Sequence, residues 1–194
     1  MRLRQAGMAL LLFLSCATTA IAEEYQIDIK GQHAFIQFKV KHLGYSWLLG
    51  EFRKFTGSFS YDEQHPEDSR VSVTIKADSI DTNHAERNKH LRSPDFFDVK
   101  RYPTITYVSN SYTDKGSGHG VIHGALTLRG VTKSVDITVE QVGAGADPWG
   151  GYRRGFLGHA TLHLADYKMP FAPKLGTASD RVELLLSIEG IRKE

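Results

Sequence analysis

Cysteine is almost missing from this chain: Cys16 is the only one among 194 residues, and it lies near the N-terminus. A small secreted scaffold held together by disulfides is therefore excluded. Cys16 also lacks the Leu-small-small context of a lipidated cysteine, because Phe13, Leu14 and Ser15 precede it. We therefore expect no lipid anchor and no other stable membrane anchor.

Long apolar runs are missing too, apart from a short one in residues 1–22. Arg2 and Arg4 precede this run, and Ala20-Ile21-Ala22 fits a small-x-small cleavage site. This pattern is typical of a cleaved secretory signal peptide, and the run is too short for a membrane span. We expect cleavage after this site, which leaves residues 23–194 as a single domain in the periplasm.

The expected mature chain also has no excess of charge of either sign. Removing Arg2 and Arg4 from the 24 basic residues leaves 22, which equals the number of acidic residues. No basic run stands out in the remaining sequence. Neither nucleic acid nor an anionic membrane surface is therefore indicated as a partner.

Motifs of nucleotide binding and nucleophilic catalysis are absent as well. The chain has no G-x-S-x-G, no G-x-G-x-x-G and no P-loop. Ser93, His90 and Asp95 offer the residue types of a catalytic triad, but Ser93-Pro94-Asp95 is typical of a cap and first turn. The sequence therefore predicts a protein that is not an enzyme and uses no cofactor.

Histidine is plentiful, and two pairs have a spacing of four: His119 with His123, and His159 with His163. On a helix this spacing places two imidazoles on one metal ion. In a strand it separates them by about 13 Å, which is too far for one ion. Both pairs lie in or beside strand-like segments, so we expect no intrinsic metal site.

Alternation of apolar and polar residues dominates the rest of the chain. In residues 34–42, Ile36, Phe38 and Val40 fall on one face and lysines on the other. The pattern recurs in 55–61, 71–77, 104–109, 121–128, 135–140, 156–164 and 182–188. Period two indicates half-buried strands.

Only residues 84–92 have a helical pattern, where Asn83 and Glu86 resemble a capping box. Eight or nine strands and one short helix predict an all-β antiparallel fold, either a barrel or a sandwich. The pattern alone does not separate these two.

Glycines on apolar strand faces favour an internal cavity over a fully packed core. Gly124 and Gly158 lie on such faces, where a missing side chain thins the inner wall. A barrel of about eight strands is wide enough to hold one small ligand. We predict that the pore is lined by Ile36, Phe38, Val40, Phe52, Val73, Ile75, Ile122, Gly124, Leu126, Gly158, Leu162, Leu184 and Leu186.

Four segments carry a resemblance to a known family: residues 31–52, 79–103, 124–135 and 147–156. They closely resemble the YceI-like family of bacterial periplasmic proteins, and the similarity extends from about residue 25 to 191. The resemblance implies an eight-stranded antiparallel lipocalin-like barrel with one short helix in a connection. It also implies a pore that holds a long isoprenoid or other amphiphilic lipid.

This resemblance indicates the role of the charged segment HAERNKHLRSPDFF, residues 84–97. It implies a helical cover at one end of the barrel, which Arg87, His90 and Arg92 anchor to neighbouring loops. We also hypothesise that Arg87 and His90 form a polar mouth that contacts the head of a ligand. Asn88 stands where many relatives have Asp, so an acidic role at this position is in doubt.

The expected function is that of a periplasmic binding protein that sequesters or carries a long isoprenoid or similar lipid. Two alternatives stay open. One is an enzyme or electron-transfer component that acts on an isoprenoid quinone, and the other is a stress-induced envelope protein with an incidental pocket. The sequence is compatible with a homodimer, but no segment specifies one.

Overall fold

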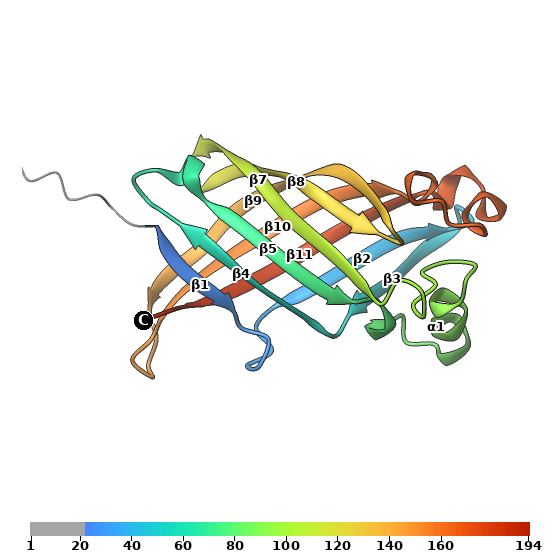
Figure 1. Cartoon of the computed structure of the whole chain (residues 1–194), viewed down its shortest axis with the longest axis horizontal. Coiled ribbons are helices and arrows are strands. Elements are labelled where there is room, and N and C mark those ends of the chain that lie inside the picture. Colours follow the sequence, from blue (N-terminus) through green and yellow to red (C-terminus); the bar gives the residue numbers. More distant parts are fainter. Residues whose placement is uncertain (1–21) are drawn as a thin grey trace, which may run out of the picture.

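The computed structural model describes residues 22–194, which lie mostly in β-strands (Figure 1). The signal peptide predicted for residues 1–22 therefore lies outside the described residues, apart from its last one. The strands are β1 (Glu23–Ile27), β2 (Phe35–His42), β3 (Ser46–Phe52), β4 (Phe55–Tyr61), β5 (Arg70–Lys76), β6 (Ile80–Asp81), β7 (Thr104–Gly116), β8 (His119–Leu128), β9 (Val131–Ala146), β10 (Tyr152–His163) and β11 (Arg181–Arg192).

The helices are short. They are η1 (Pro66–Asp68), η2 (Ala77–Ser79), α1 (Ala85–Arg92), η3 (Leu164–Tyr167), η4 (Ala172–Leu175) and η5 (Thr177–Ser179). Among the helices of residues 22–194, none has both the length and the apolar content that a membrane span requires.

The strands close into an antiparallel barrel with eight strand positions. Three positions are each filled by two consecutive short strands, namely β1 with β2, β3 with β4, and β5 with β6. β11 closes the ring, because its first half pairs with β2 and its last residues pair with β1. The predicted eight-stranded barrel with one short α-helix is confirmed. Closure leaves few unpaired strand edges, which protects the sheet from pairing with other chains.

The strands extend beyond the alternating segments that predicted them. β9, for example, has 16 residues, whereas alternation indicated only 135–140. The extra residues include Gly143 and Gly145, which carry no side chain to show a pattern. β3 gave no pattern either, since Leu48 and Leu49 are adjacent and one of them must face solvent.

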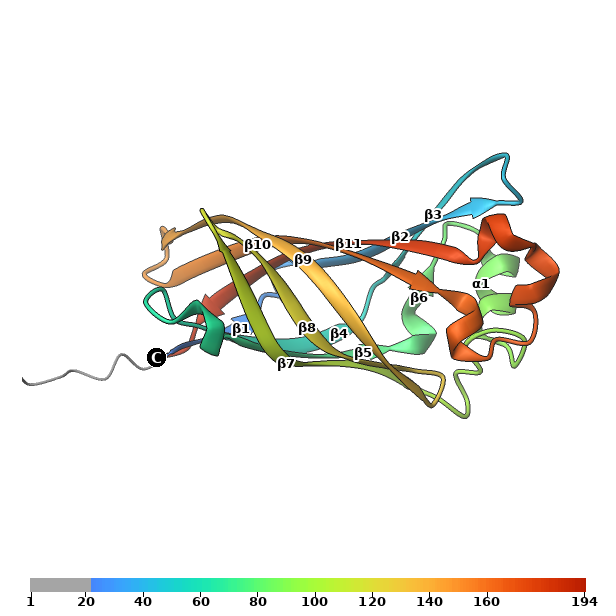
Figure 2. The same cartoon turned by 90° about the horizontal axis from the view of Figure 1, so that it is seen from above.

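The two ends of the barrel differ (Figures 1 and 2). At one end, α1 and residues 164–179 lie across the barrel; we call this the helix end. At the opposite end lie the connections 62–69, 117–118 and 147–151; we call this the turn end.

The N-cap of helix α1 lies one residue later than predicted. His84, not Asn83, is the N-cap, and its Nδ1 accepts a hydrogen bond from the Arg87 N–H at 3.2 Å. Asn83 instead has a φ of 60°, and its N–H donates to Asp81 Oδ1 at 2.9 Å. The capping box predicted from Asn83 and Glu86 is therefore wrong, because the turn before the helix uses Asn83.

Candidate functional site

Two cavities lie inside the barrel, one after the other along its axis. The larger, of about 290 Å³, is at the helix end, and the smaller, of about 150 Å³, extends toward the turn end. Ile36, Ile75, Leu126 and Leu184 contact both cavities, so they form the boundary between them. We call the two cavities together the pore. Its size is in the range of small-molecule sites in proteins.

Twelve of the predicted lining residues lie on the wall of the pore. The alternation placed them correctly because a shift of one residue moves a whole strand face from inside to outside. Their contact with a ligand stays a prediction. The twelve are Ile36, Phe38, Val40, Phe52, Val73, Ile75, Ile122, Leu126, Gly158, Leu162, Leu184 and Leu186.

Gly124 is the exception, and the prediction that it thins the wall of the pore is wrong. A Cβ at this position would come within 2.6 Å of the ring and the hydroxyl of Tyr107. That hydroxyl donates to the Val135 carbonyl at 3.0 Å, so the ring is fixed over the glycine. The buried Tyr107 ring occupies the space next to Gly124, and this ring lines the smaller cavity.

Gly158 borders the smaller cavity directly. A Cβ there would lie 3.2 Å from Ile137 Cγ2 and 3.4 Å from Leu186 Cβ. A larger side chain at this position would therefore extend between two wall residues into the pore.

Two phenols, Tyr107 and Tyr112, lie on the wall of the smaller cavity. Burial raises the pKa of Tyr112 to about 12 and also raises that of Tyr107, so both phenols stay neutral. Aliphatic and aromatic side chains form nearly all of the remaining wall of the smaller cavity. Such a wall binds an apolar chain by removing it from water.

Two polar side chains of the charged segment lie at the helix end of the pore. Arg87 and His90 are both on the wall of the larger cavity. Arg87 donates to Thr82 Oγ1 at 2.8 Å and to the Thr82 carbonyl at 2.7 Å. His90 Nε2 lies 3.0 Å from Asp95 Oδ2. The Arg87 contacts anchor the segment to the turn before it as expected, whereas the His90 contact lies within the segment. Contact with the head of a ligand stays a prediction.

Arg92 and Arg129 complete the anchoring of the helix end. Arg92 Nε donates to the Asp78 carbonyl at 2.7 Å. Arg129 donates to the Pro94 carbonyl at 3.1 Å and to the Lys168 carbonyl at 2.8 Å. Arg129 thus joins the loop after α1 to the segment 164–179. No sequence pattern indicated this link, because the three residues are far apart in the chain.

Asn88 is the buried residue of α1, and its side chain holds the turn before the helix. Its Oδ1 accepts from the N–H and the hydroxyl of Thr82 at 2.9 and 2.7 Å, and its Nδ2 donates to Asp81 Oδ1 at 2.9 Å. A carboxylate could make the first two bonds but not the third. In this chain the amide is required because Asp81 is its neighbour.

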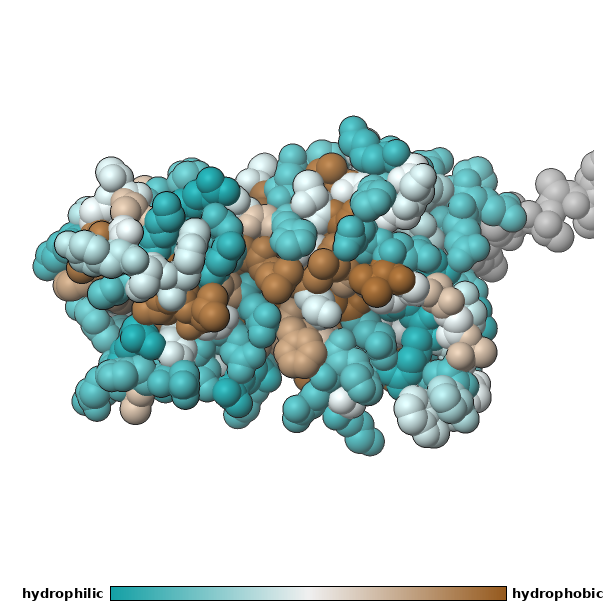
Figure 3. All heavy atoms as spheres, turned by 180° about the vertical axis from the view of Figure 1, so that it is seen from behind, coloured by the Kyte–Doolittle hydropathy of each residue, from teal (hydrophilic) through white to brown (hydrophobic). Residues whose placement is uncertain are grey.

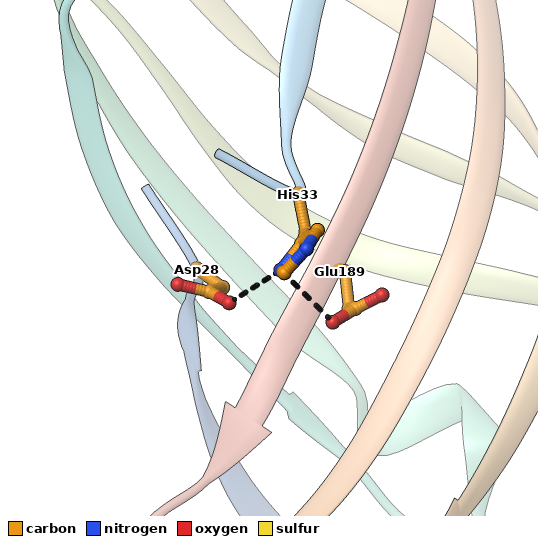
Figure 4. Close-up of side chains that lie close together, drawn as sticks. All are labelled: Asp28, His33 and Glu189. Atoms are coloured by element: carbon orange, nitrogen blue, oxygen red, sulfur yellow. Dashed lines mark hydrogen bonds and ion pairs between the residues drawn. The ribbon is translucent and has the colours of Figure 1, made fainter. Parts of the chain in front are cut away.

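Asp28, His33 and Glu189 come together on the outside of the barrel (Figure 4). His33 Nδ1 lies 2.9 Å from Asp28 Oδ2 and 3.7 Å from Glu189 Oε1. The expectation of no metal assumed that no three ligands would meet, and that assumption is wrong. Glu189 is on β11, and the other two are in the connection between β1 and β2, so their proximity was invisible in the sequence.

Arg153 occupies the centre of this cluster. Its NH1 donates to Asp28 Oδ2 at 2.8 Å and also to Glu189 Oε1, and its Nε donates to Asp147 Oδ2 at 2.8 Å. A metal ion would need the same two oxygens. Burial alone would raise the pKa of Asp28, but hydrogen bonds from Arg153, His33 and the Gly31 N–H lower it to about 2. The cluster is an ion-pair network that fastens the 28–34 connection to the barrel.

Thr113, His123 and Asp136 form a second unexpected group on the outer face of β7, β8 and β9. Thr113 Oγ1 lies 3.0 Å from His123 Nε2, and His123 Nδ1 lies 2.8 Å from Asp136 Oδ1. This is the order of a catalytic triad. His123 is in register with Asp136 on β9 and with Ser111 on β7, two residues from Thr113, so neighbouring strands bring the three side chains together. The group is best described as a cross-strand hydrogen-bond chain.

Comparison with known families and curated proteins gives consistent matches. The model of a family described as YceI-like domain matches residues 25–190. A UPF0312 protein from Pseudomonas aeruginosa (strain LESB58) is 53% identical over 188 residues, which cover 97% of this chain and 97% of that protein. The UPF0312 protein plu2095 from Photorhabdus laumondii is 51% identical over 178 residues, covering 92% and 91%.

Solved structures share the barrel. A YCEI protein from Campylobacter jejuni is 26% identical with a TM-score of 0.72, over 97% of this chain and 100% of that chain. Burkholderia cenocepacia BcnA has a TM-score of 0.75 at 21% identity, over 84% and 98%. A polyisoprenoid binding domain from Saccharophagus degradans has a TM-score of 0.62 at 15% identity, over 87% and 98%. The last two likenesses concern the fold alone.

Proposed function

The chain belongs to the YceI-like family, and on this premise we propose that it is a periplasmic binding protein for a long isoprenoid or a similar amphiphilic lipid. The observation that carries the proposal is the apolar pore, in which two cavities follow one another along the barrel axis. The Saccharophagus degradans domain, described as polyisoprenoid binding, has the same fold and supports this class of ligand.

The apolar wall is sufficient to bind such a ligand without a metal or a catalytic group. Each buried methylene contributes about 0.8 kcal/mol. Part of this gain is offset by ordering a flexible tail and by the loss of free motion on binding. Affinity therefore depends on tail length and shape, which suits a protein that sequesters or carries a lipid.

We propose that the head of the ligand lies at the helix end and the tail points to the turn end. Arg87 and His90, on the wall of the larger cavity, lie at the helix end. The smaller cavity is enclosed by aliphatic and aromatic side chains over most of its wall. A polar head finds hydrogen-bonding partners at the first of these places, and a buried polar group without a partner costs free energy.

The test is mass spectrometry of an organic extract from protein purified without detergent from the periplasm of its native host. A defined isoprenoid at near-stoichiometric amount is expected. Conversion of an added isoprenoid quinone by the purified protein would favour an enzyme or electron-transfer component instead. A pore that stays empty would favour an envelope protein with an incidental pocket.

The periplasmic location is tested by fractionation together with N-terminal sequencing. The mature protein should be found in the periplasmic fraction and begin at Glu23. A chain that keeps residues 1–22 and stays with the cytoplasmic fraction would contradict this part of the proposal.

We also propose a homodimer through the outer face of β2, β3 and β11. Phe35, Trp47, Leu49 and Leu185 expose large apolar side chains there, with Leu49 66% exposed. Figure 3 shows apolar groups gathered across one outer face of the molecule. Within residues 22–194, only the last two residues of β3 pair with a strand other than β2, so the edge Ser46–Gly50 is free for a second copy.

Light scattering after size exclusion tests the dimer. The wild type should have the mass of two chains, and a Leu49→Lys variant the mass of one. A wild type that stays monomeric at high concentration would contradict the homodimer.

A further inference from the structure

Arg154 is a buried cation that lipid binding in the pore does not explain. It is only 1% exposed and belongs to the largest fully buried side chains of residues 22–194. On β10 it follows the same alternation as Phe156 and Gly158, which line the smaller cavity. Arg154 therefore lies on the inner face of the barrel, one step closer to the turn end.

Polar and aromatic partners surround the Arg154 guanidinium. Its NH2 donates to Glu63 Oε1 at 2.5 Å, its NH1 to Gln141 Oε1 at 2.9 Å and its Nε to the Tyr25 hydroxyl at 3.2 Å. Its Cζ also lies 4.3 Å from the centre of the Tyr61 ring. Each nitrogen of the guanidinium thus has a partner, which is the condition for burying a charge.

On β9 and β10 the smaller cavity ends at this layer. On β9, Val139 lines the cavity, whereas Gln141, two residues further, does not. On β10, Phe156 lines it and Arg154 does not. Tyr61 on β4 contacts both the cavity and the guanidinium. The wall changes from apolar to polar within two residues on β9 and β10, and on the side of β5 the last lining residue is the charged Arg70.

We infer that Arg154, with Glu63, Gln141, Tyr25 and Tyr61, forms the floor of the pore and sets the longest tail that the pore accepts. The inference rests on the proposed function, since it assigns a limit to the same ligand. It makes Arg154 a residue that determines specificity for tail length.

The physical reason is the cost of disturbing a buried charge. A tail that reached past Phe156 would have to displace the guanidinium from its partners, and removing a buried charge from its partners is strongly unfavourable. Removing the Arg154 side chain instead lengthens the pore by about two residues of strand, or roughly 5 Å along the axis of a tilted barrel. This is about the length of one isoprene unit.

The experiment measures the affinity of a series of prenols (geraniol, farnesol, geranylgeraniol and longer ones) by displacement of N-phenyl-1-naphthylamine. For the wild type, affinity should rise with each unit and then stop rising at a limiting length. For Arg154→Ala, the first prenol beyond that limit should bind about tenfold or more tighter than to the wild type. Prenols below the limit should keep their wild-type affinity within about twofold.

Arg153→Ala is the matched control. It removes an equally paired arginine from the next position, whose side chain lies on the outside of the barrel. Its limiting length should equal that of the wild type.

Ile188→Phe keeps the assignment testable if Arg154→Ala does not fold. Ile188 lines the cavity and pairs with Phe156 next to the floor, so an added ring there should shorten the limit by about one unit. An unchanged limit in the folded Arg154→Ala variant, or in Ile188→Phe, would overturn the floor while leaving the proposed function intact. A wild type that binds no prenol of any length would overturn the proposed function itself, and the floor with it.

Discussion

Glycines beside aromatic rings shape the interior of this barrel at the scale of the residue. Gly50 makes room for Phe38, Gly124 for Tyr107, and Gly190 for Phe59. In each case the ring comes from a nearby strand and covers the glycine backbone, a known means of stabilising glycine within a sheet. Glycine on an inner face is therefore not by itself a sign of a cavity.

Leucine substitutions separate the two kinds of glycine. Gly124→Leu must displace Tyr107 and should destabilise the protein by about 1–3 kcal/mol or more. Gly158→Leu extends into the smaller cavity, so it should change the stability little and sharply weaken the binding of a long prenol. Thermal unfolding of the ligand-free protein and prenol affinity, measured together, check both expectations.

Gly143→Leu is the control for these variants. Gly143 lies in β9, and a Cβ there would meet no atom within 4 Å. Unchanged stability and binding are expected. Normal prenol binding by folded Gly158→Leu would contradict the assignment of Gly158 to the pore.

Asn88 offers a second prediction for a single residue. The Asn83 N–H and the Asn88 side chain hold the pKa of Asp81 below its usual value. Asn88→Asp replaces the second of these donors with a like charge, so the variant should be less stable than the wild type at neutral pH. The difference should shrink at acid pH, as protonation of the new carboxyl removes the repulsion. Denaturant unfolding across pH measures this. Asn88→Ala is the control that removes the donor without adding a charge, so its stability difference from the wild type should vary less with pH.

At the scale of the element, short strands replace long ones wherever the chain must leave the barrel wall. β3 and β4 are separated at Arg53 and Lys54, whose N–H groups donate to the Ser79 carbonyl and to Ser79 Oγ. β1 and β2 are separated by the 28–34 connection, which Arg153 fastens to the wall. At the first break, Ser79 in the 3₁₀ turn η2 accepts the backbone N–H groups that the ladder leaves without a partner. At the second break, the Arg153 side chain pairs with the charge of Asp28.

Because of Asp28 in the 28–34 connection, the free energy of unfolding should depend on pH in the acid range. The pKa of Asp28 is lowered to about 2 in the folded protein, against about 3.9 in an unfolded chain. The resulting stability, roughly 2 kcal/mol, is present above about pH 4 and is lost as the pH falls toward 2. Asp28→Asn should therefore be less stable than the wild type at neutral pH, and the gap should narrow on acidification. Urea unfolding at a series of pH values checks it, and a gap that stays constant would contradict it.

At the scale of the whole molecule, the apolar pore lies between two ends that arginines hold together. Hydrogen bonds join the segments of the helix end, and the layer around Arg154 lies at the turn end. Arg129 and Arg92 hold the helix end together through backbone carbonyls, and Arg154 holds the turn end through side chains. Both ends are stabilised by arginines within the protein itself. We therefore expect that the fold needs no bound metal.

Chelation tests this statement on the intact protein. Extensive treatment with a strong chelator should leave both the melting temperature and the retention of ligand unchanged, because Arg153 holds the oxygens of the three-ligand cluster. Arg153→Ala frees these oxygens, and it is the variant in which added zinc should raise the melting temperature. A stoichiometric zinc in the wild type that resists dialysis would contradict the prediction.

The sequence by itself determined the class of fold and the inner face of each segment that alternates. Period-two alternation is a local property, and a strand with one apolar face has only one register that turns this face to the inside. For this reason residues 55–61 were predicted with the bounds of β4, and Leu126 and Leu184 were predicted to face inward.

Only the tertiary structure decided which polar groups meet. Arg154 reaches Glu63, Arg153 reaches Asp28, and Tyr107 covers Gly124, and in each case residues far apart or on separate strands come together. No local pattern marks such pairs, because a buried charge or ring is stabilised by its partners in space and not by its neighbours in the chain. The end of the pore, the ion-pair cluster and the true role of Gly124 all follow from contacts of this kind.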